Sequence, residues 1–518
     1  MWSRIHPRII AAGAVCAALA LASCTSSGTT PASQQNSSTT LNTAYYGDPS
    51  GGIDPDVFYD VEGDSMMLAL YDTLLTYRPG TTRLAPDLAT SWHESASGLT
   101  YSFNLRHGVR FHDGTAFNAR AVEINFRRRM IVKQAVSYMT AGIASMQTPS
   151  PYQFVVHLKK RNNAFLDYMA SMYGPKIVSP QALTEHAGSD HAQKWLSTHE
   201  DGTGAYQLAT YHPGSQYVLN RFDGYWGKQP YFKRVVISVI PDVSTAELQL
   251  RSGSLDLLVH GIANSELQSM QAAGLHVIKF PAAIRQVVLL NQNKAPFDSL
   301  PVRQAAAAAI MAADQRAVPA VFGSYATVAR SAYPQVMSVA GELAPLSPQP
   351  ATRVAAGTKI TLSYTSSEPD LLQLAQYYQQ ALDKAGFKVT LKGDTVSQEF
   401  GYISNPGAAP NATISTFNPD AAHPDTWGRP VWGAGGGVNL FDSKDKKVDQ
   451  LLDAGAQAPT QVLERKWYAA AGERASRDAY VIPVDDADDS AVASSSLTGF
   501  SHVPTYIWMV SFAALARR

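Results

Sequence analysis

The sequence predicts a mixed α/β protein. Short stretches in which apolar and polar residues alternate, as in half-buried strands, recur between stretches with an apolar residue every three or four positions, as in amphipathic helices. A compact strand–helix–strand unit can be read directly at residues 359–392. No repeat with a fixed period of 20–50 residues is found, so a solenoid or a propeller is not expected.

The first half of the chain contains the clearest strands and one capped helix. Asn118 is expected to cap a helix on which Val122, Phe126 and Met130 recur every four residues. Strands with alternating or continuous apolar character are predicted at residues 101–105, 154–158, 235–240 and 287–290.

Longer helices are predicted in the second half. Pro301 suits a first helical turn, and the apolar residues after it share one face. In the unit at 359–392, Gly386 is expected to end the helix before the second strand. Residues 341–357 are rich in Pro, Ala and Gly and are predicted to form a long surface connection. Two further helices are expected around residues 448–452 and 463–474.

Composition excludes several classes of protein. The 518 residues include 42 basic and 42 acidic side chains, so the chain lacks the positive field that a nucleic-acid-binding protein needs. Hydrophobic residues make up 45%, enough for a core in the two to four domain-sized units that this length suggests. The two cysteines are Cys16 and Cys24, which leaves the rest without a disulfide, an iron–sulfur cluster or a thiolate zinc site.

Residues 1–24 have the pattern of a secretory signal. Basic residues precede thirteen uncharged residues, Ile9 to Leu21, a run too short to span a membrane comfortably. The run ends in a sequence, LASC, that resembles the lipobox of bacterial lipoproteins, which predicts lipidation at Cys24; an ordinary signal peptide with an incidental Cys is the alternative. Residues 25–41, rich in Ser and Thr, are predicted to be a tether. We therefore expect an extracytoplasmic protein anchored by lipid to the outer face of the cell membrane.

Motifs for catalysis or metal binding are weak. There is no G-x-S-x-G elbow, and His93-Glu94 is not completed into a zinc helix. The Gly202–Gly204 segment and the run of glycines at 433–437 lack the phosphate-loop pattern and are interpreted as a tight turn and a flexible loop. His107 and His112 are interpreted as structural rather than as metal ligands, and the acidic run at 485–489 as a solvated loop.

Two segments carry a resemblance to a known family. Residues 84–92 (LAPDLATSW) and 101–114 (YSFNLRHGVRFHDG) resemble the signature of the solute-binding lipoproteins of peptide/nickel-type ABC importers, the bacterial extracellular solute-binding family 5. Residues 201–206 are similar to the GTGPY turn of that family, with Ala205 where Pro is usual. The resemblance covers nearly all of residues 42–505.

The resemblance implies a two-lobed, periplasmic-binding-protein-like α/β fold (type II, cluster C) with an extra domain inserted in lobe I. The ligand of such proteins lies between the lobes, which close over it. By position, the implied boundaries are 42–78, 197–283 and 480–518 for the three parts of lobe I, 79–196 for the inserted domain and 284–479 for lobe II.

The resemblance also implies a position for the ligand's amino group. Peptide-binding members carry an Asp in a motif like W-x-x-D-Y-x-x-P, and this Asp pairs with the α-ammonium. Asp420 falls at that position, with Phe417 at the aromatic one and Ala421 where Tyr is usual. An ammonium enclosed between closing lobes needs such an anionic partner. The alternative for Asp420 is a surface or helix-capping carboxylate.

Further ligand-binding candidates surround this motif. Asn418 adjoins Phe417, and Trp427 and Trp432 are candidates for apolar walls of the cleft. Tyr46 and Tyr138 lie in segments that face the cleft in similar proteins. Plain core packing is the alternative for each aromatic side chain.

The implied function is capture and delivery. The resemblance implies a protein that is not an enzyme, needs no cofactor and no metal, binds a short peptide and presents it to an ABC permease with a cytoplasmic ATPase. We expect a monomer that does not bind nucleic acid. The alternatives are another solute (a nickel chelate, haem, glutathione or an oligosaccharide), a peptide-sensing lipoprotein without import, or a secreted hydrolase whose catalytic triad comes from distant residues.

Overall fold

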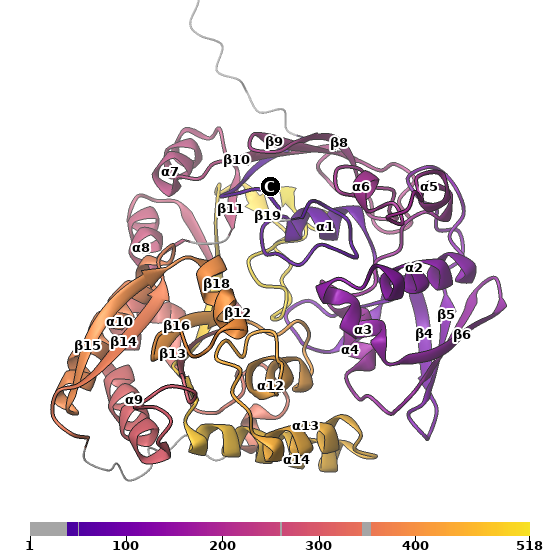
Figure 1. Cartoon of the computed structure of the whole chain (residues 1–518). Coiled ribbons are helices and arrows are strands. Elements are labelled where there is room, and N and C mark those ends of the chain that lie inside the picture. Colours follow the sequence, from indigo (N-terminus) through magenta and orange to yellow (C-terminus); the bar gives the residue numbers. More distant parts are fainter. Residues whose placement is uncertain (1–38, 50, 260–261, 344–353) are drawn as a thin grey trace, which may run out of the picture. The chain divides into compact units, whose positions relative to one another are not determined.

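The computed structural model describes residues 39–49, 51–259, 262–343 and 354–518, and it confirms the mixed α/β class. The predicted signal peptide, most of the predicted tether and most of the connection at 341–357 lie outside these residues. Within them, a sheet of twelve strands runs in the order β15-β14-β16-β12-β18-β11-β1-β10-β9-β8, with β13 also beside β18 and β17 beside β12 (Figure 1).

The strands of this sheet come from the whole length of the chain. Their bounds are β1 (Thr40–Tyr45), β8 (Tyr206–His212), β9 (Gln216–Arg221), β10 (Arg234–Val239), β11 (Leu257–Val259), β12 (His276–Leu290), β13 (Ala326–Val328), β14 (Thr358–Thr365), β15 (Phe387–Asp394), β16 (Ala412–Phe417), β17 (Val481–Pro483) and β18 (Asp485–Ala493).

Strand β12 joins the two halves of the sheet. Its first part pairs antiparallel with β18, from His276 opposite Ala493 to Ile284 opposite Ala487. From Arg285 onward it pairs instead with β16 and β17. Arg285, fully buried at this change of partner, donates to the main-chain oxygens of Asp485 and Ser331, both at 2.8 Å. Its third nitrogen donates to the Asp486 carboxylate, so each nitrogen of this buried guanidinium makes a hydrogen bond where the two halves of the sheet meet.

A second sheet lies within residues 79–196. It has the order β4-β5-β7-β6, and α2 packs against β6 and β7 (Figure 1). As predicted, Asn118 caps α2, since its side-chain oxygen accepts from the Ala121 amide at 3.1 Å. The elements here are β4 (Ala89–Glu94), β5 (Thr100–Leu105), α2 (Ala119–Val132), α3 (Tyr138–Ala141), β6 (Ile143–Ser150), β7 (Gln153–Leu158), α4 (Phe165–Ala170), α5 (Pro180–Glu185) and α6 (Gln193–Leu196).

The predicted strand–helix–strand unit is present as β14, α10 (Pro369–Lys384) and β15, with the strands parallel and Gly386 at a φ of 107° after the helix. α10 packs against α9 (Leu300–Phe322), which has the expected Pro in its first turn. The remaining elements are α1 (Asp64–Leu70), β2 (Leu75–Tyr77), β3 (Leu84–Pro86), α7 (Val243–Ser252), α8 (Asn264–Ala272), α11 (Val396–Gly401), α12 (Asp425–Trp432), α13 (Lys446–Ala456), α14 (Gln461–Asp478), β19 (Leu497–Thr498) and β20 (Ala516–Arg517).

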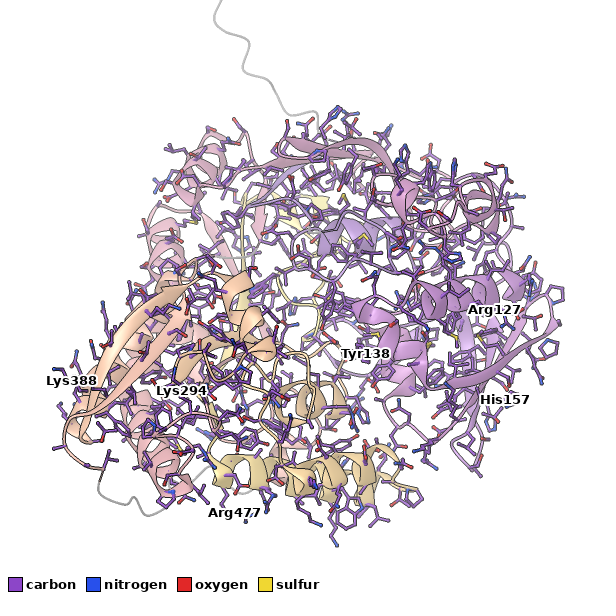
Figure 2. The ribbon with its side chains drawn as sticks, viewed as in Figure 1. Arg127, Tyr138, His157, Lys294, Lys388 and Arg477 are labelled. Carbon is purple, nitrogen blue, oxygen red and sulfur yellow. The ribbon has the colours of Figure 1, made fainter. Side chains whose placement is uncertain are left out.

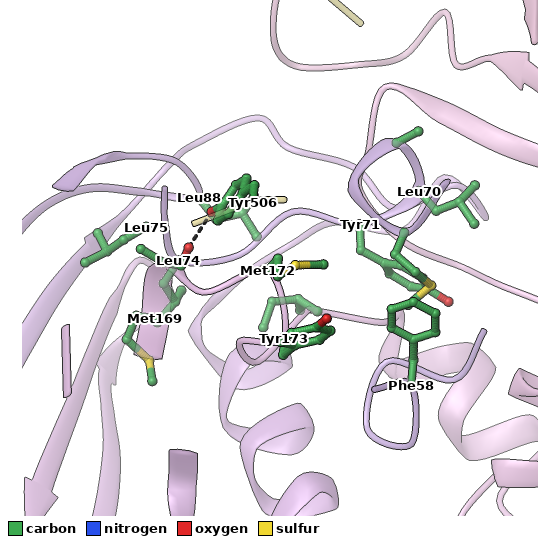
Figure 3. Packing of buried hydrophobic residues seen from close by; sticks show 14 of the residues in the cluster. Phe58, Leu70, Tyr71, Leu74, Leu75, Leu88, Met169, Met172, Tyr173 and Tyr506 are labelled. Atoms are coloured by element: carbon green, nitrogen blue, oxygen red, sulfur yellow. Dashed lines mark hydrogen bonds between the residues drawn. The ribbon is translucent and has the colours of Figure 1, made fainter. Parts of the chain in front are cut away.

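The hydrophobic core crosses some of the segment boundaries inferred from the sequence. One continuous cluster contains residues from 41–77, from 88–196 and from 503–515. Figure 3 shows part of it, where Phe58, Tyr71, Met172 and Tyr173 pack together. Nearby, the Tyr506 hydroxyl donates to the Ala170 carbonyl and ties the C-terminal segment to α4. The segment at 79–196 therefore shares its core with the segments that flank it.

Two predictions are wrong. The tether does not extend to residue 41, because Thr40 and Leu41 belong to β1, where Leu41 is fully buried opposite Val235. The acidic run at 485–489 is not a solvated loop but the start of strand β18, with Asp485 fully buried. The facing strand β12 supplies the counter-charges: Arg285 pairs with Asp486, and Lys279 lies 2.7 Å from Asp488.

Candidate functional site

A large cavity brings most of the predicted site residues together. Its volume is about 1170 Å³, and its walls come from loops after β1, the start of α3, strands β12 and β18, the start of α10, and residues 416–438. Asp420, Phe417, Asn418, Tyr46 and Tyr138 all line it. Residues separated by more than 350 positions therefore share one concave surface large enough for a small ligand.

Asp420 is held in the wall of this cavity by two tyrosines. Its side chain is nearly buried, with 7% of the residue exposed. The Tyr59 hydroxyl lies 3.0 Å from both carboxylate oxygens, and the Tyr138 hydroxyl donates to Oδ2 at 2.5 Å. Tyr138 begins α3 and is labelled in Figure 2. The two donors come from segments that lie far before Asp420 in the sequence, so the carboxylate bridges distant parts of the chain.

The loop that carries Asp420 is fixed at its main chain. Ser171 Oγ donates to the Asp420 carbonyl at 2.5 Å, and the Ala422 amide donates to the Tyr77 hydroxyl at 3.0 Å. Strand β16 ends at Phe417 and α12 begins at Asp425, so the loop between them is short and its two ends are anchored. This arrangement orients the carboxylate before any ligand arrives.

Burial makes this carboxyl group unusually basic. Burial raises the pKa of Asp420 from 3.8 to about 6, although the hydrogen bonds from Tyr138 and Tyr59 act in the opposite direction. No cationic side chain among the described residues contributes to this pKa. Burial, together with the charge of Asp420, raises the pKa of both tyrosines well above the usual value, so they stay protonated and act as donors.

The cavity wall is rich in carboxylates. Among the described residues that line it, Arg429 is the only basic one, whereas eight are acidic: Asp60, Glu62, Glu368, Asp370, Asp420, Asp425, Asp488 and Asp489. Arg429 is already engaged, because it makes two hydrogen bonds to Asp425, at 3.0 and 2.9 Å, and one to Asp453 at 3.0 Å.

The two predicted tryptophans do not line the cavity. Trp427 and Trp432 are 1% and 2% exposed and belong to a separate core cluster with α13 and α14. The Trp427 indole donates to the Ala332 carbonyl at 3.0 Å, and Trp432 packs edge-on against Tyr333. The reason is helical geometry: α12 turns Asp425, Arg429 and Pro430 toward the cavity and its tryptophans away from it.

Sequence reasoning missed several residues of the wall. Tyr59, which donates to Asp420, lies in a stretch without a recognisable pattern, and the same is true of Tyr168 and Tyr173. The glycine loop at 433–437, interpreted as merely flexible, contributes Gly435, Gly436 and Gly437 to the wall. Only the resemblance to a family, and no local signal, could have pointed to these positions.

Two features are absent from the residues that the structure describes. None of their helices is long and apolar enough to cross a membrane. No group of three or more His, Cys, Asp or Glu side chains among them is arranged to hold a metal ion. His112 instead bonds to Glu200 at 2.7 Å, and His107 stacks on Tyr152.

The chain is similar to known proteins in both sequence and structure. Residues 83–439 match the model of the family described as "Bacterial extracellular solute-binding proteins, family 5 Middle". An Escherichia coli protein named "Probable D,D-dipeptide-binding periplasmic protein DdpA" is 28% identical over 258 residues, which is 49% of each chain, so this match spans about half the length of that relative. The glutathione-binding protein GsiB of Salmonella choleraesuis is 25% identical over 436 residues, 80% of this chain and 83% of its own.

A solved structure has the same fold. The periplasmic binding protein DppA from Helicobacter pylori, solved in complex with the peptide STSA, aligns with a TM-score of 0.78 at 22% identity, over 92% of this chain and 98% of that chain. The likeness confirms the periplasmic-binding-protein-like fold that the sequence predicted.

Proposed function

The chain belongs to the bacterial extracellular solute-binding proteins of family 5, and from this premise we propose that it captures short peptides in the 1170 Å³ cavity and delivers them to an ABC permease. As a member of this family the chain is an extracytoplasmic solute carrier and not an enzyme. The ligand, the permease with its cytoplasmic ATPase and the monomeric state are parts of the proposal.

The environment of Asp420 is the observation that carries the proposal. A peptide has a free α-ammonium, which requires an anionic partner where water is excluded. Asp420 offers a buried carboxylate that is oriented by tyrosine hydroxyls and is not neutralised by a described cation. The names of the relatives agree with a peptide ligand, since DdpA is named for D,D-dipeptides and the DppA structure contains the peptide STSA.

We propose that binding couples to closure of the two lobes. The carboxylate belongs to the proposed lobe II, whereas its donors Tyr59 and Tyr138 belong to the proposed lobe I and its inserted domain. A ligand that contacts all three segments favours the closed form through its differential affinity. Small-angle scattering is expected to give a smaller radius of gyration with saturating peptide, and an unchanged radius would contradict closure.

Two experiments test the peptide assignment. Mass spectrometry of the small molecules that co-purify with the protein is expected to find short peptides. Calorimetry with a bound peptide is expected to show that Asp420→Ala loses at least about 1.5 kcal/mol of binding free energy, the lower range for a hydrogen bond to a charged group. A ligand without an ammonium group, such as an oligosaccharide, would bind the variant and the wild type alike.

Glutathione is the second candidate, because GsiB matches 80% of this chain. Glutathione carries one ammonium and two carboxylates. A wall with eight acidic residues, in which Arg429 is already engaged, repels the second carboxylate. Nickel chelates, haem and oligosaccharides remain alternatives, as does a sensor without import. Direct titration with glutathione separates it from a neutral tripeptide, which we expect to bind more tightly.

We also propose that a lipid on Cys24 anchors the protein to the membrane. The basis is the sequence LASC alone. Metabolic labelling with a tagged fatty acid is expected to mark the wild-type protein and to leave Cys24→Ala unlabelled; a labelled variant would reject this anchor.

A further inference from the structure

A second set of contacts joins the proposed inserted domain to the proposed lobe II, away from the cavity. Asn163, two positions before α4 begins, donates through its main-chain amide to the Ala456 carbonyl at 2.9 Å. Its side-chain Nδ2 lies 3.2 Å from the Gly455 carbonyl, 3.0 Å from the Ala458 carbonyl and 3.1 Å from Glu464 Oε2. One asparagine thus contacts four acceptors that lie between 292 and 301 positions later in the chain.

These contacts complete the end of helix α13. The last carbonyls of an α-helix have no donor within the helix, and α13 ends at Ala456. Asn163 donates to the Ala456 carbonyl at this end and to the Ala458 carbonyl in the connection to α14. A segment from elsewhere in the chain therefore supplies donors of the kind that a C-terminal cap provides in other helices.

The side chain of Asn163 is held in the orientation that these contacts need. Arg161 Nε donates to Asn163 Oδ1 at 2.9 Å, and Arg161 is itself paired with Glu94 of β4 at 3.2 Å. Because Oδ1 accepts from Arg161, Nδ2 is the atom that faces α13 and α14. The donor is therefore oriented by contacts within residues 79–196 alone.

Glu464 connects this contact to the loop that carries Asp420. Its Oε2 accepts from Asn163, whereas its Oε1 lies 2.9 Å from His423 Nε2. His423 is buried and follows Asp420 by three positions in that loop. Neither Asn163 nor Glu464 lines the cavity. Any effect of Asn163 on a ligand must therefore act through the position of these segments and not through contact with the ligand.

We propose that Asn163 is a positioning residue that holds the lobes closed and slows the release of the ligand. We call Asn163, with its acceptors at residues 455–458 and Glu464, the latch. A ligand enclosed between the lobes leaves only after they reopen, so a contact made only in the closed form lowers the dissociation rate. Reopening must break the latch, because Asn163 belongs to the proposed inserted domain and its four acceptors to the proposed lobe II. The inference rests on the proposed peptide-binding function and adds a determinant of residence time outside the ligand site.

The rate of peptide release tests the latch. The probes are radiolabelled alanine peptides of two to five residues, chased with an excess of unlabelled peptide to give the dissociation rate. Calorimetry gives the dissociation constant, and the two values together give the association rate. Asn163→Ala keeps the main-chain amide but removes the three side-chain contacts. We expect its dissociation rate to rise at least about threefold, as the loss of one hydrogen bond predicts, while the association rate stays unchanged.

A rescue experiment locates the contact. Asn163→Asp keeps the shape of the side chain but cannot donate, and its carboxylate would face Glu464 Oε2, so release should be faster than in Asn163→Ala. In the double variant Asn163→Asp/Glu464→Gln, the new amide can donate to the new carboxylate. Release should therefore be slower than in Asn163→Asp alone, which a merely unfolded or loosened chain would not show.

A matched control comes from the same segment. Asn104 is exposed on β5, and its side chain donates to Ser91 Oγ at 2.9 Å within the sheet of residues 79–196. Asn104→Ala should leave both rates as in the wild type. Thermal unfolding of each variant verifies that it is folded.

The outcomes separate the latch from the proposed function. Peptides that leave Asn163→Ala and Asn163→Asp as slowly as the wild type overturn the latch but leave peptide binding intact. A slower association at an unchanged dissociation rate also overturns it, because Asn163 would then act on the open form. Release from the double variant that is no slower than from Asn163→Asp overturns the contact with Glu464. If no peptide of any length binds, both the latch and the proposed function fall.

Discussion

Replacing Asp420 with Asn separates a ligand-binding role of this side chain from a structural one. Asn keeps the shape of the side chain and an oxygen that can accept from Tyr59 or Tyr138, but it carries no charge. The variant should therefore remove the effects of the negative charge and leave the packing of the side chain nearly unchanged. Two quantities follow from the pKa of about 6, the stability of the empty protein and the pH dependence of binding.

The first quantity is the stability of the protein without ligand. The shift from 3.8 to about 6 corresponds to a cost of about 3 kcal/mol for keeping Asp420 ionised in the folded state at pH 7. Between these two pKa values the folded state holds a proton that the unfolded state has lost, so the contribution of this group to stability falls as pH rises through that window. Asp420→Asn is therefore expected to be at least as stable as the wild type at pH 7, with a gain of up to about 3 kcal/mol that vanishes toward pH 4.

The second quantity is the affinity for peptide. An ammonium binds the ionised carboxylate, so below pH 6 the protein must release a proton when it binds. The wild type should bind about tenfold more weakly at pH 5 than on the plateau above pH 7, as one pH unit below the pKa requires. Asp420→Asn should lose at least about 1.5 kcal/mol at pH 7 and show no dependence on pH in this range. Calorimetry at pH 5, 6, 7 and 8, in two buffers of different ionisation enthalpy, measures both the affinity and the number of protons released.

Asp314 provides a matched control. It is a buried carboxyl group on α9 that accepts from the Tyr378 hydroxyl at 2.7 Å, and burial raises its pKa to about 8. It does not line the cavity. Asp314→Asn should also relieve a buried charge but leave peptide affinity unchanged. A ligand-binding role for Asp420 is refuted if Asp420→Asn lowers stability while the affinity and its pH profile stay as in the wild type.

Three further predictions concern the surroundings of the site. Tyr138→Phe removes a hydrogen bond that lowers the pKa of Asp420, so the midpoint of the pH–affinity curve should move above 6 and affinity at pH 7 should fall by about 0.5–1.5 kcal/mol; a curve that moves to lower pH in the same titration would contradict this. Trp427→Ala should destabilise the fold by about 3–5 kcal/mol in denaturant unfolding while the folded fraction keeps its affinity, and lost affinity without lost stability would place the indole at the ligand. Gly436→Ala should destabilise by about 1–3 kcal/mol in the same unfolding assay, because the new Cβ would lie 2.3 Å from the Pro430 carbonyl oxygen; Gly437→Ala, which meets no atom within 4 Å, is its control and should stay within about 0.5 kcal/mol of the wild type.

Elements with their own local signal could be predicted from the sequence. The cap at Asn118, the Pro at the start of α9 and the glycine that ends α10 are each determined by neighbours within a few residues. Strand β18 could not be predicted in this way. Its acidic residues form a strand because Arg285 and Lys279 of β12, some 200 positions earlier, provide the counter-charges, and no local window contains that information.

The residues of the site also divide into those that the sequence could indicate and those that depend on distant contacts. Asp420 was located through a resemblance, and the structure places its side chain in the cavity, whereas its role toward a ligand stays a prediction. Tyr59 could not be identified, because its significance lies in a contact with a residue 361 positions away. The tryptophans were misplaced because their direction depends on which face of α12 packs on the core, and that face is set by α13 and α14.

The contrast between Asp420 and Asp425 indicates why the carboxylate that is proposed to bind the ligand, that of Asp420, is held by tyrosines and not by cations. Asp425 lies five positions later in the same wall, and Arg429 neutralises it through two hydrogen bonds, so its charge is satisfied before a ligand arrives. An arginine beside Asp420 would leave an ammonium competing with a fixed cation for the same oxygens. Hydroxyl donors orient the carboxylate without cancelling its charge, and burial keeps that charge costly while the site is empty. An arriving ammonium relieves this cost. Part of the binding free energy would therefore come from the desolvation cost that the folded protein already carries at Asp420.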